Sequence, residues 1–239
     1  MKRHVQTFLL LIGLALLVSG CLYPQDSSNS EEVLTNHVED VQQAVDRYLQ
    51  NQSVLPIKTR EEDTAIYQKY VVDFARLVPA YMTEPPPSAF ENGGNYMYVL
   101  IDVEENPTVK LYDLRVPDQL HNVQQQINFY TVTEERYPRG IEIAPGVFEL
   151  NEELIKDADM KIPSPFVSQS MLPLVMASDG TVYVDYRPDL EQIIEHLAVA
   201  ALPADKDLRT SLPDESIFVP AQSLPYRYED GEIIFDVEI

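Results

Sequence analysis

The chain has 239 residues, of which 39 are acidic and 17 are basic, so its formal net charge at pH 7 is −22. A surface of that sign repels nucleic acid, and we expect no nucleic-acid partner. The single cysteine excludes an intrachain disulfide and a cysteine-ligated metal cluster. The acidity suits a salty or alkaline exterior, or else it recruits cations or a basic partner.

The N-terminus has the layout of a signal peptide. Two basic residues precede the uncharged, apolar run 8–18, which is too short to cross a bilayer as a helix. The string LVSGC at 17–21 resembles the bacterial lipobox. That resemblance implies that residues 1–20 are removed by cleavage between Gly20 and Cys21, and that Cys21 then carries lipid. The alternative is that Cys21 is an apolar residue at the end of a signal peptide cleaved elsewhere.

The polar segment 21–30 predicts a flexible tether between the lipid and the fold. Beyond it, apolar residues recur in alternating steps of four and three, and they predict a helix from residue 31 to about Asn51. These residues are Leu34, Val38, Val41, Val45 and Tyr48. A near-helical pattern predicts a second helix at 66–82. Gly93 and Gly94 precede a strand, so they predict a turn rather than a phosphate-binding loop.

Internal similarity is the most informative feature of the remaining sequence. The string VQQAVDRY at 41–48 recurs as VQQQINFY at 123–130, and DLRVPDQL at 113–120 resembles DYRPDLEQ at 185–192. In the second pair an aspartate stands where a helix N-cap belongs, at Asp118 and at Asp189. Chance similarity between short biased strings is the alternative explanation.

Three β-hairpins complete the pattern. Asp-Gly pairs between alternating segments predict two-residue turns in 172–186 and in 224–237, and a third hairpin is expected at 96–115. The predicted domains are therefore three helix-hairpin units, the last one shorter, at 31–115, 116–187 and 188–239. Since an isolated helix or hairpin cannot bury its apolar face, the predicted fold class is α+β, built from repeated αββ units with antiparallel strands.

Catalytic and metal-binding patterns are missing from the sequence. His37, His121 and His196 fall in or near predicted helices without metal-ligand spacing. No motif activates the serines near the central hairpin. The acidic stretch 151–161 lacks the glycine of an EF-hand loop, so it predicts a solvated helix rather than a calcium site. We predict no enzyme activity, no metal site and no cofactor.

Tyrosine is abundant, with 14 residues against no tryptophan. Seven of these tyrosines fall on the predicted hairpin strands: Tyr96, Tyr98, Tyr112, Tyr183, Tyr186, Tyr226 and Tyr228. Aromatic rings on strands pair across a sheet, and on an uncovered sheet face they offer contact area to a protein or a glycan. They are the candidate partner-binding residues of the sequence.

Beyond the lipobox, the chain after residue 20 resembles the YphF-like lipoproteins of Bacillus-type Gram-positive bacteria. The resemblance implies membrane attachment and carries over no functional residues. Together these patterns predict a lipid-anchored binding or scaffold protein on the extracytoplasmic face of the cell membrane, attached to membrane lipid through Cys21 and bound to a protein partner at the membrane surface. The alternatives are a solute-binding lipoprotein of a transporter and, third, a hydrolase of the cell envelope.

Overall fold

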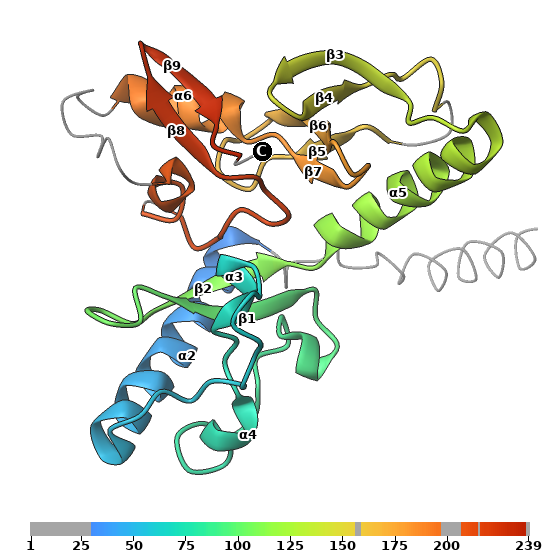
Figure 1. The fold of residues 1–239 in the computed structure, drawn as a ribbon. Coiled ribbons are helices and arrows are strands. Elements are labelled where there is room, and N and C mark those ends of the chain that lie inside the picture. The colour runs from blue at the N-terminus through green and yellow to red at the C-terminus, as the bar shows by residue number, and fades with distance from the viewer. Residues whose placement is uncertain (1–29, 156–158, 197–206, 215, 238–239) are drawn as a thin grey trace, which may run out of the picture.

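The computed structural model describes residues 30–155, 159–196, 207–214 and 216–237. The predicted signal peptide, Gly20, Cys21 and the tether up to residue 29 lie outside the described residues. Figure 1 shows two lobes, with the elements up to β2 in the lower lobe and those that follow α5 in the upper lobe. In the ranges described, no helix is both long enough and apolar enough to cross a membrane.

The lower lobe consists of a helix packed against a hairpin, as predicted. Helix α2 (Glu31–Gln52) lies against strands β1 (Tyr96–Ile101) and β2 (Thr108–Asp113), which pair antiparallel from Tyr96 opposite Asp113 to Ile101 opposite Thr108. Four residues of the predicted apolar stripe are buried and the fifth packs beside them: Leu34, Val38, Val41, Val45 and Tyr48. The helix ends where Ser53 adopts a left-handed conformation (φ 56°) and donates its N–H to the Leu49 carbonyl.

The predicted helix at 66–82 is wrong. Two single turns form instead, α3 (Ile66–Lys69) and α4 (Phe74–Leu77), and the residues between them run beside β1. The Val72 N–H donates to the Tyr98 carbonyl (2.9 Å), and the Leu100 N–H donates to the Tyr70 carbonyl (2.8 Å). The β-branched pair Val71-Val72 thus extends along a strand edge rather than continuing a helix. The glycine turn is confirmed, because Gly93 (φ 82°) ends the 3-10 turn η2 (Phe90–Asn92).

The middle range contains five strands, where the sequence predicted one hairpin. After α5 (Arg115–Glu134) come β3 (Arg139–Ala144), β4 (Val147–Leu150), β5 (Lys161–Pro163), β6 (Met171–Ala177) and β7 (Val182–Val184). Their order is β3-β4-β6-β5, with β7 also paired to β6. The predicted hairpin is the β6–β7 pair, but its turn has three residues, since Ala177 donates its N–H to the Thr181 carbonyl.

The last range adds α6 (Arg187–His196), the 3-10 turn η4 (Leu208–Ser211), β8 (Tyr226–Glu229) and β9 (Glu232–Phe235). The β8–β9 hairpin has the predicted two-residue turn, because Glu229 pairs with Glu232. Asp230 and Gly231 both have positive φ (51° and 93°), as a turn that matches strand twist requires. The fold class is α+β with antiparallel sheets, as predicted.

The two similar helix strings make the same contacts in three dimensions. The side-chain amide of Gln42 on α2 accepts a hydrogen bond from the Val109 N–H (2.7 Å) and donates to the carbonyl two residues earlier (3.0 Å). The amide of Gln124 on α5 accepts from the Val182 N–H (3.0 Å) and likewise donates to the carbonyl two residues earlier (2.9 Å). In both copies the helix therefore holds the start of the hairpin's second strand.

The second similarity lies where each hairpin runs into the next helix. Arg115 at the start of α5 pairs its guanidinium with Asp113, and Arg187 at the start of α6 does the same with Asp185. Each aspartate also accepts the backbone N–H of its arginine, at 2.9 Å and 3.0 Å. Because both helices begin at the arginine, the predicted N-caps are wrong: Asp118 and Asp189 lie inside the first turn.

Hydrophobic packing divides the described residues into two clusters. One cluster lies within 34–111. The other combines α5, the five-stranded sheet, α6 and the β8–β9 hairpin with Tyr67, Val71, Val99 and Tyr112, so all three predicted units contribute to it. Residues 217–223, which we call the strap, cross between the lobes. The Leu111 N–H donates to the Ile217 carbonyl (2.8 Å) in the lower lobe, and the Val184 N–H donates to the Gln222 carbonyl (2.9 Å) in the upper lobe.

Candidate functional site

Most of the tyrosines predicted to bind a partner are in the core. Five of the seven are buried, with at most 2% of each side chain exposed: Tyr96, Tyr98, Tyr112, Tyr186 and Tyr226. The physical reason is that the hairpin faces carrying these rings are covered by helices and by neighbouring strands, so no open sheet face presents them. Tyr183 and Tyr228 are half-buried beside the core. The five buried tyrosines are therefore unavailable to a partner.

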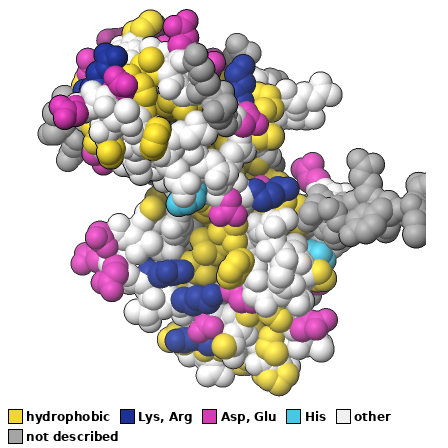
Figure 2. All heavy atoms as spheres, turned by 90° about the vertical axis from the view of Figure 1, so that its right-hand side faces the viewer, with side chains coloured by type: hydrophobic (Ala, Val, Ile, Leu, Met, Phe, Trp, Pro, Cys, Tyr) yellow, Lys and Arg dark blue, Asp and Glu magenta, His cyan; other side chains and the backbone are white. Residues whose placement is uncertain are grey.

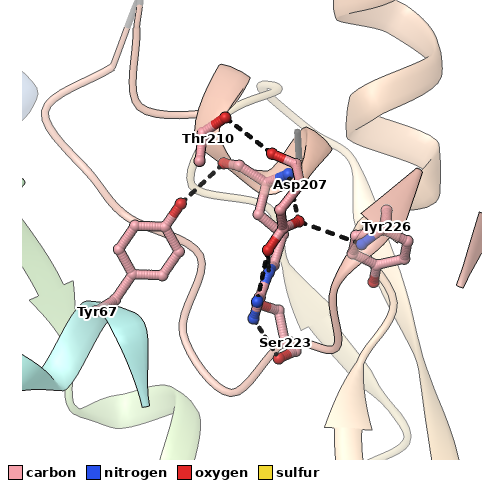
Figure 3. Close-up of polar contacts among 6 residues, drawn as sticks. Tyr67, Asp207, Thr210, Ser223 and Tyr226 are labelled. Atoms are coloured by element: carbon pink, nitrogen blue, oxygen red, sulfur yellow. Dashed lines mark hydrogen bonds and ion pairs between the residues drawn. The ribbon is translucent and has the colours of Figure 1, made fainter. Parts of the chain in front are cut away.

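A closed polar network joins the lobes near the strap (Figure 3). The Tyr67 hydroxyl on α3 donates to the Arg209 carbonyl on η4 (3.0 Å). The Arg209 guanidinium bonds to Asp207 (2.7 Å) and to the Ser223 carbonyl (2.9 Å), and Asp207 also accepts the Tyr226 N–H (3.2 Å). Burial raises the pKa of Tyr67 well above its usual range. Every group here has a partner within the fold, so the network holds the lobes together rather than offering a site.

A serine-histidine contact in the lower lobe was not predicted. The Nδ1 atom of His37 lies 2.9 Å from the Ser88 hydroxyl, which lies 2.6 Å from the Tyr98 hydroxyl. A serine and a histidine at this distance can act as a nucleophile and its base, but only 3% of Ser88 is exposed, and a substrate carbonyl needs access to the oxygen. Burial raises the pKa of Tyr98 to about 12. These contacts fasten α2 to the segment that precedes β1.

The remaining histidines and the acidic stretch do not converge on a site. His121 on α5 is exposed and lies 2.6 Å from the Gln125 amide, and the His196 side chain lies outside the part of the chain that the structure describes. The predicted helix at 151–161 is wrong where the chain is described, because residues 152–154 form a turn in which Asn151 accepts the Glu153 N–H. Among the described residues, no three His, Cys, Asp or Glu side chains are placed to hold a metal ion.

An open groove of about 830 Å³ runs along the outer side of α5. One wall is α5 from Gln119 to Glu134, and the other contains Leu154, Ile155 and Asp159. The neighbouring face of α5 is apolar and packs against the sheet through Val116, Leu120, Val123 and Ile127, and Val123 borders the groove as well. Figure 2 views the side toward which α5 extends and shows two bulges separated by a narrower waist, with acidic side chains scattered over both.

Amide and aromatic side chains line this groove. Asn122 and Gln126 line it, and no side-chain hydrogen bond of either carboxamide is formed among the described residues. Phe129 also lines it and is 75% exposed, although a phenylalanine of this kind gains about 2 kcal/mol when it is buried. Val132, also in the C-terminal half of α5 but not in the groove lining, is 83% exposed. Exposed apolar groups beside unpaired polar groups are typical of a binding surface.

The described charged residues that line the groove are acidic. They are Glu134 and Asp159, and no lysine or arginine lines the groove among the residues described. The last turn of α5 has no basic residue to offset the partial negative charge of the helix C-terminus. Gln119 marks the other end, where its amide donates to the Lys161 carbonyl (3.0 Å) and ties α5 to β5. Negative potential is therefore present at both ends of the groove.

The face of α2 that corresponds to the groove is contacted by another segment of the chain. The repeat places Phe129 and Tyr130 of α5 where α2 has Arg47 and Tyr48. The Arg47 guanidinium donates to the Tyr81 carbonyl (2.6 Å), and the Tyr48 and Tyr81 rings meet edge to face with centroids 5.2 Å apart. Tyr81 thus occupies on α2 the place that stands open beside Phe129 on α5.

The covering segment, residues 81–88, reaches the other end of α2 as well. Gln52, which corresponds to Glu134, donates to the Tyr81 hydroxyl (3.2 Å). His37, which corresponds to Gln119, contacts Ser88. The segment therefore contacts both ends of the α2 face that corresponds to the groove. In the second copy, the chain after α5 turns away into β3 and β4 and leaves the equivalent face open.

Comparison with known proteins gives one match. Residues 34–113, about a third of the chain, match the model of the YphF family N-terminal domain. This range corresponds to the lower lobe, from the first buried residue of α2 to the last residue of β2. Comparisons with curated proteins and with solved structures gave no match. The groove on α5 lies outside the matched range.

Proposed function

We propose that this chain is a lipid-anchored extracytoplasmic binding protein, and that it holds a partner in the groove on α5. The observation that carries the proposal is the groove itself, where an exposed phenylalanine and unpaired carboxamides stand together. Burying Phe129 against a partner contributes favourable free energy, and the carboxamides of Asn122 and Gln126 fix the partner's orientation by hydrogen bonding.

The anchor rests on the sequence at 17–21. A lipidated Cys21 with two or more acyl chains attaches persistently to a bilayer, whereas a single chain holds only reversibly. The high net negative charge repels anionic headgroups and keeps the folded body away from the membrane surface. A partner at that surface would then meet a body that is tethered but free to turn.

The two alternatives have less support. A solute-binding lipoprotein of a transporter usually has two α/β lobes with parallel strands around a cleft. Here every pair between the named strands is antiparallel, and the strap crosses between the lobes. A hydrolase needs an accessible nucleophile, and the serine that contacts His37 is buried.

Affinity capture from native membranes tests the groove. We expect the wild-type chain to recover a partner that the Phe129→Ser variant does not recover. Phe90→Ser is the matched control, because Phe90 is 65% exposed on the lower lobe, outside the groove. Equal recovery by Phe129→Ser and the wild-type chain would contradict the proposal.

The anchor has its own test. Mass analysis of the chain from its native membrane should show that Cys21 is the N-terminal residue and that it carries acyl chains. The Cys21→Ser variant should be released from the membrane fraction. An unmodified thiol, or a leader still attached, would remove the proposed attachment without affecting the groove.

A further inference from the structure

The occupant of the groove can be specified further, on the premise of the proposed function. We propose that the α5 groove binds an extended peptide segment of a partner protein, about seven or eight residues long, with an aromatic anchor and a basic residue at each end. The observation behind this is the first copy of the repeat, where the chain's own segment 81–88 contacts both ends of the corresponding face of α2.

The length of the site fits a peptide. Gln119 and Glu134 are 15 residues apart on α5, which at 1.5 Å per residue corresponds to about 22 Å. On α2 the equivalent span, from His37 to Gln52, is contacted by Ser88 at one end and Tyr81 at the other. Seven steps of extended or polyproline-like chain, at about 3.1 Å each, also cover about 22 Å. A compact small molecule would contact only part of such a groove.

The polar lining also suits a peptide backbone. Asn122 and Gln126 are four residues apart, so their carboxamides are separated by about 6 Å along the helix. Equivalent groups of an extended chain recur every two residues, at about 6.6 Å. Each carboxamide supplies a donor and an acceptor, which are the two functions that each peptide unit presents. The spacing of the helix amides therefore matches that of an extended backbone.

The apolar lining selects the anchor. On α2 the ring of Tyr81 meets Tyr48 edge to face. Tyr130 occupies the corresponding position of α5, with Phe129 beside it and Leu154 on the opposite wall. An aromatic side chain of the partner placed here would repeat the Tyr48–Tyr81 contact, and such ring pairs add to the free energy of burying their area.

The charges distinguish the two copies. On α2 a cation, Arg47, donates to the covering segment, whereas α5 has Phe129 at this position and Glu134 where α2 has Gln52. Asp159 adds a second carboxylate near Gln119, whose amide lies 3.4 Å from the Asp159 carbonyl. Arg136 follows α5 but does not line the groove. The partner segment must therefore bring the cations, one near each end.

Two nine-residue peptides test this inference on the full chain, extracted from membranes in non-ionic detergent. Both have the sequence of residues 80–88 with alanine at the position of Glu84. In one peptide lysine replaces both terminal residues, Ala80 and Ser88, and in the other glutamate replaces both. We expect the lysine peptide to bind about tenfold more tightly at low salt, and the difference to shrink as salt is added.

Paired variants assign the preference to the groove. Glu134→Gln with Asp159→Asn should abolish most of the difference between the peptides, while Glu104→Gln with Glu105→Gln, in the β1–β2 turn, should leave it unchanged. All four side chains are exposed and the changes are isosteric, so unfolding midpoints should stay the same. Equal binding of the two peptides, or an unchanged preference in the groove variant, would overturn the inference.

Other occupants give distinct results. If a neutral polysaccharide binds in a Phe129-dependent way and neither peptide does, the peptide inference fails while the proposed function stands. If the chain dimerises and the Phe129→Ser variant is monomeric, the occupant is a second copy of the chain, and the inference again fails. If Phe129→Ser has no effect on membrane capture, the proposed function itself fails.

Discussion

Helices α2 and α5 start from similar sequences and end in different surroundings. Both bury an apolar stripe against a hairpin, and both use a glutamine at the same position to hold the hairpin's second strand. Residues 81–88 contact the outer side of α2 at both ends, whereas the corresponding side of α5 lines an open groove. The inner faces therefore build the fold, and the difference between the outer faces is the basis for the proposed partner site.

The family match follows the same division. It covers the lower lobe, in which residues 81–88 contact the helix face, and it ends before α5 begins. A fold does not by itself define a function, which depends on the site that the fold carries. The similarity of the lower lobe to the YphF N-terminal domain therefore says little about the partner, and the groove on α5 says more.

Removing a side chain from the shared inner face should have the largest effect on stability. Ile127 on α5 is fully buried, so Ile127→Ala leaves a cavity and should lower the free energy of unfolding by about 3 kcal/mol. Urea denaturation measures this loss. Ile127→Val should cost only about 1 kcal/mol. A loss below about 1 kcal/mol for the alanine variant would mean that α5 is not packed on the sheet as described.

A buried carboxyl group on helix α6 should make the stability of the fold depend on pH. Asp189 on α6 is fully buried, its Oδ2 accepts the Ser164 hydroxyl (2.7 Å), and its Oδ1 has no partner among the described residues. Burial raises the pKa of Asp189 from 3.8 to about 6, against a smaller lowering by the Ser164 hydrogen bond. Because the folded pKa is the higher one, the stabilising contribution is present below pH 3.8 and is lost as the pH rises through about 6.

Comparison with the Asp189→Asn variant isolates this contribution. Between pH 7 and pH 4 the wild-type chain should gain about 2 kcal/mol of stability relative to the variant. Asp118, which has the corresponding place on α5, is exposed, and Asp118→Asn should show no such change. Parallel pH profiles for wild type and Asp189→Asn would show that the carboxyl group is not buried.

The two glutamines should contribute alike. Each makes two hydrogen bonds to backbone groups of a hairpin, and truncation leaves the paired N–H without its acceptor. We expect Gln42→Ala and Gln124→Ala each to lower stability by about 1.5 kcal/mol in urea titrations. If one variant loses stability and the other does not, the repeated contact is not equivalent in the two copies.

The outer faces should differ, with the smallest effects of the series. Tyr81→Ala removes the ring contact with Tyr48 and should cost about 1 kcal/mol. Phe129→Ala on α5 should change stability by less than about 0.5 kcal/mol, because the side chain is exposed. Thermal melts of the two variants give the comparison. A large loss for Phe129→Ala would indicate that the chain itself covers the groove.

The sequence predicted those elements whose pattern is local. The stripe from Leu34 to Tyr48 determined α2, and the Asp230-Gly231 pair determined the two-residue turn of the β8–β9 hairpin. The segment 66–82 was mispredicted because β1 recruits Val71 and Val72 through backbone hydrogen bonds that no local pattern encodes. The β3–β4 hairpin had a readable signal, since Gly146 (φ 71°) lies between alternating segments, but it was overlooked.

The candidate site was harder to predict. Tyrosine abundance pointed to the sheet faces, yet burial on both sides of the hairpins puts most of those rings in the core. The groove combines residues of α5 with residues near Leu154 and Asp159, which are brought together only by the fold. The available clue was the repeat, because aligning 41–48 with 123–130 shows Phe129 in the place of Arg47.

The central claim is that a partner occupies the α5 groove in the native membrane, and site-specific photocrosslinking tests it most directly. A photoreactive amino acid at position 126, in place of Gln126, should form an adduct with one partner protein on illumination of intact cells. The same amino acid at position 44, where α2 has the corresponding buried Ala44, serves as the internal control and should form none. The account would be contradicted if position 126 forms no adduct. It would also be contradicted if an exposed position such as Glu104 gives the same adduct yield as position 126.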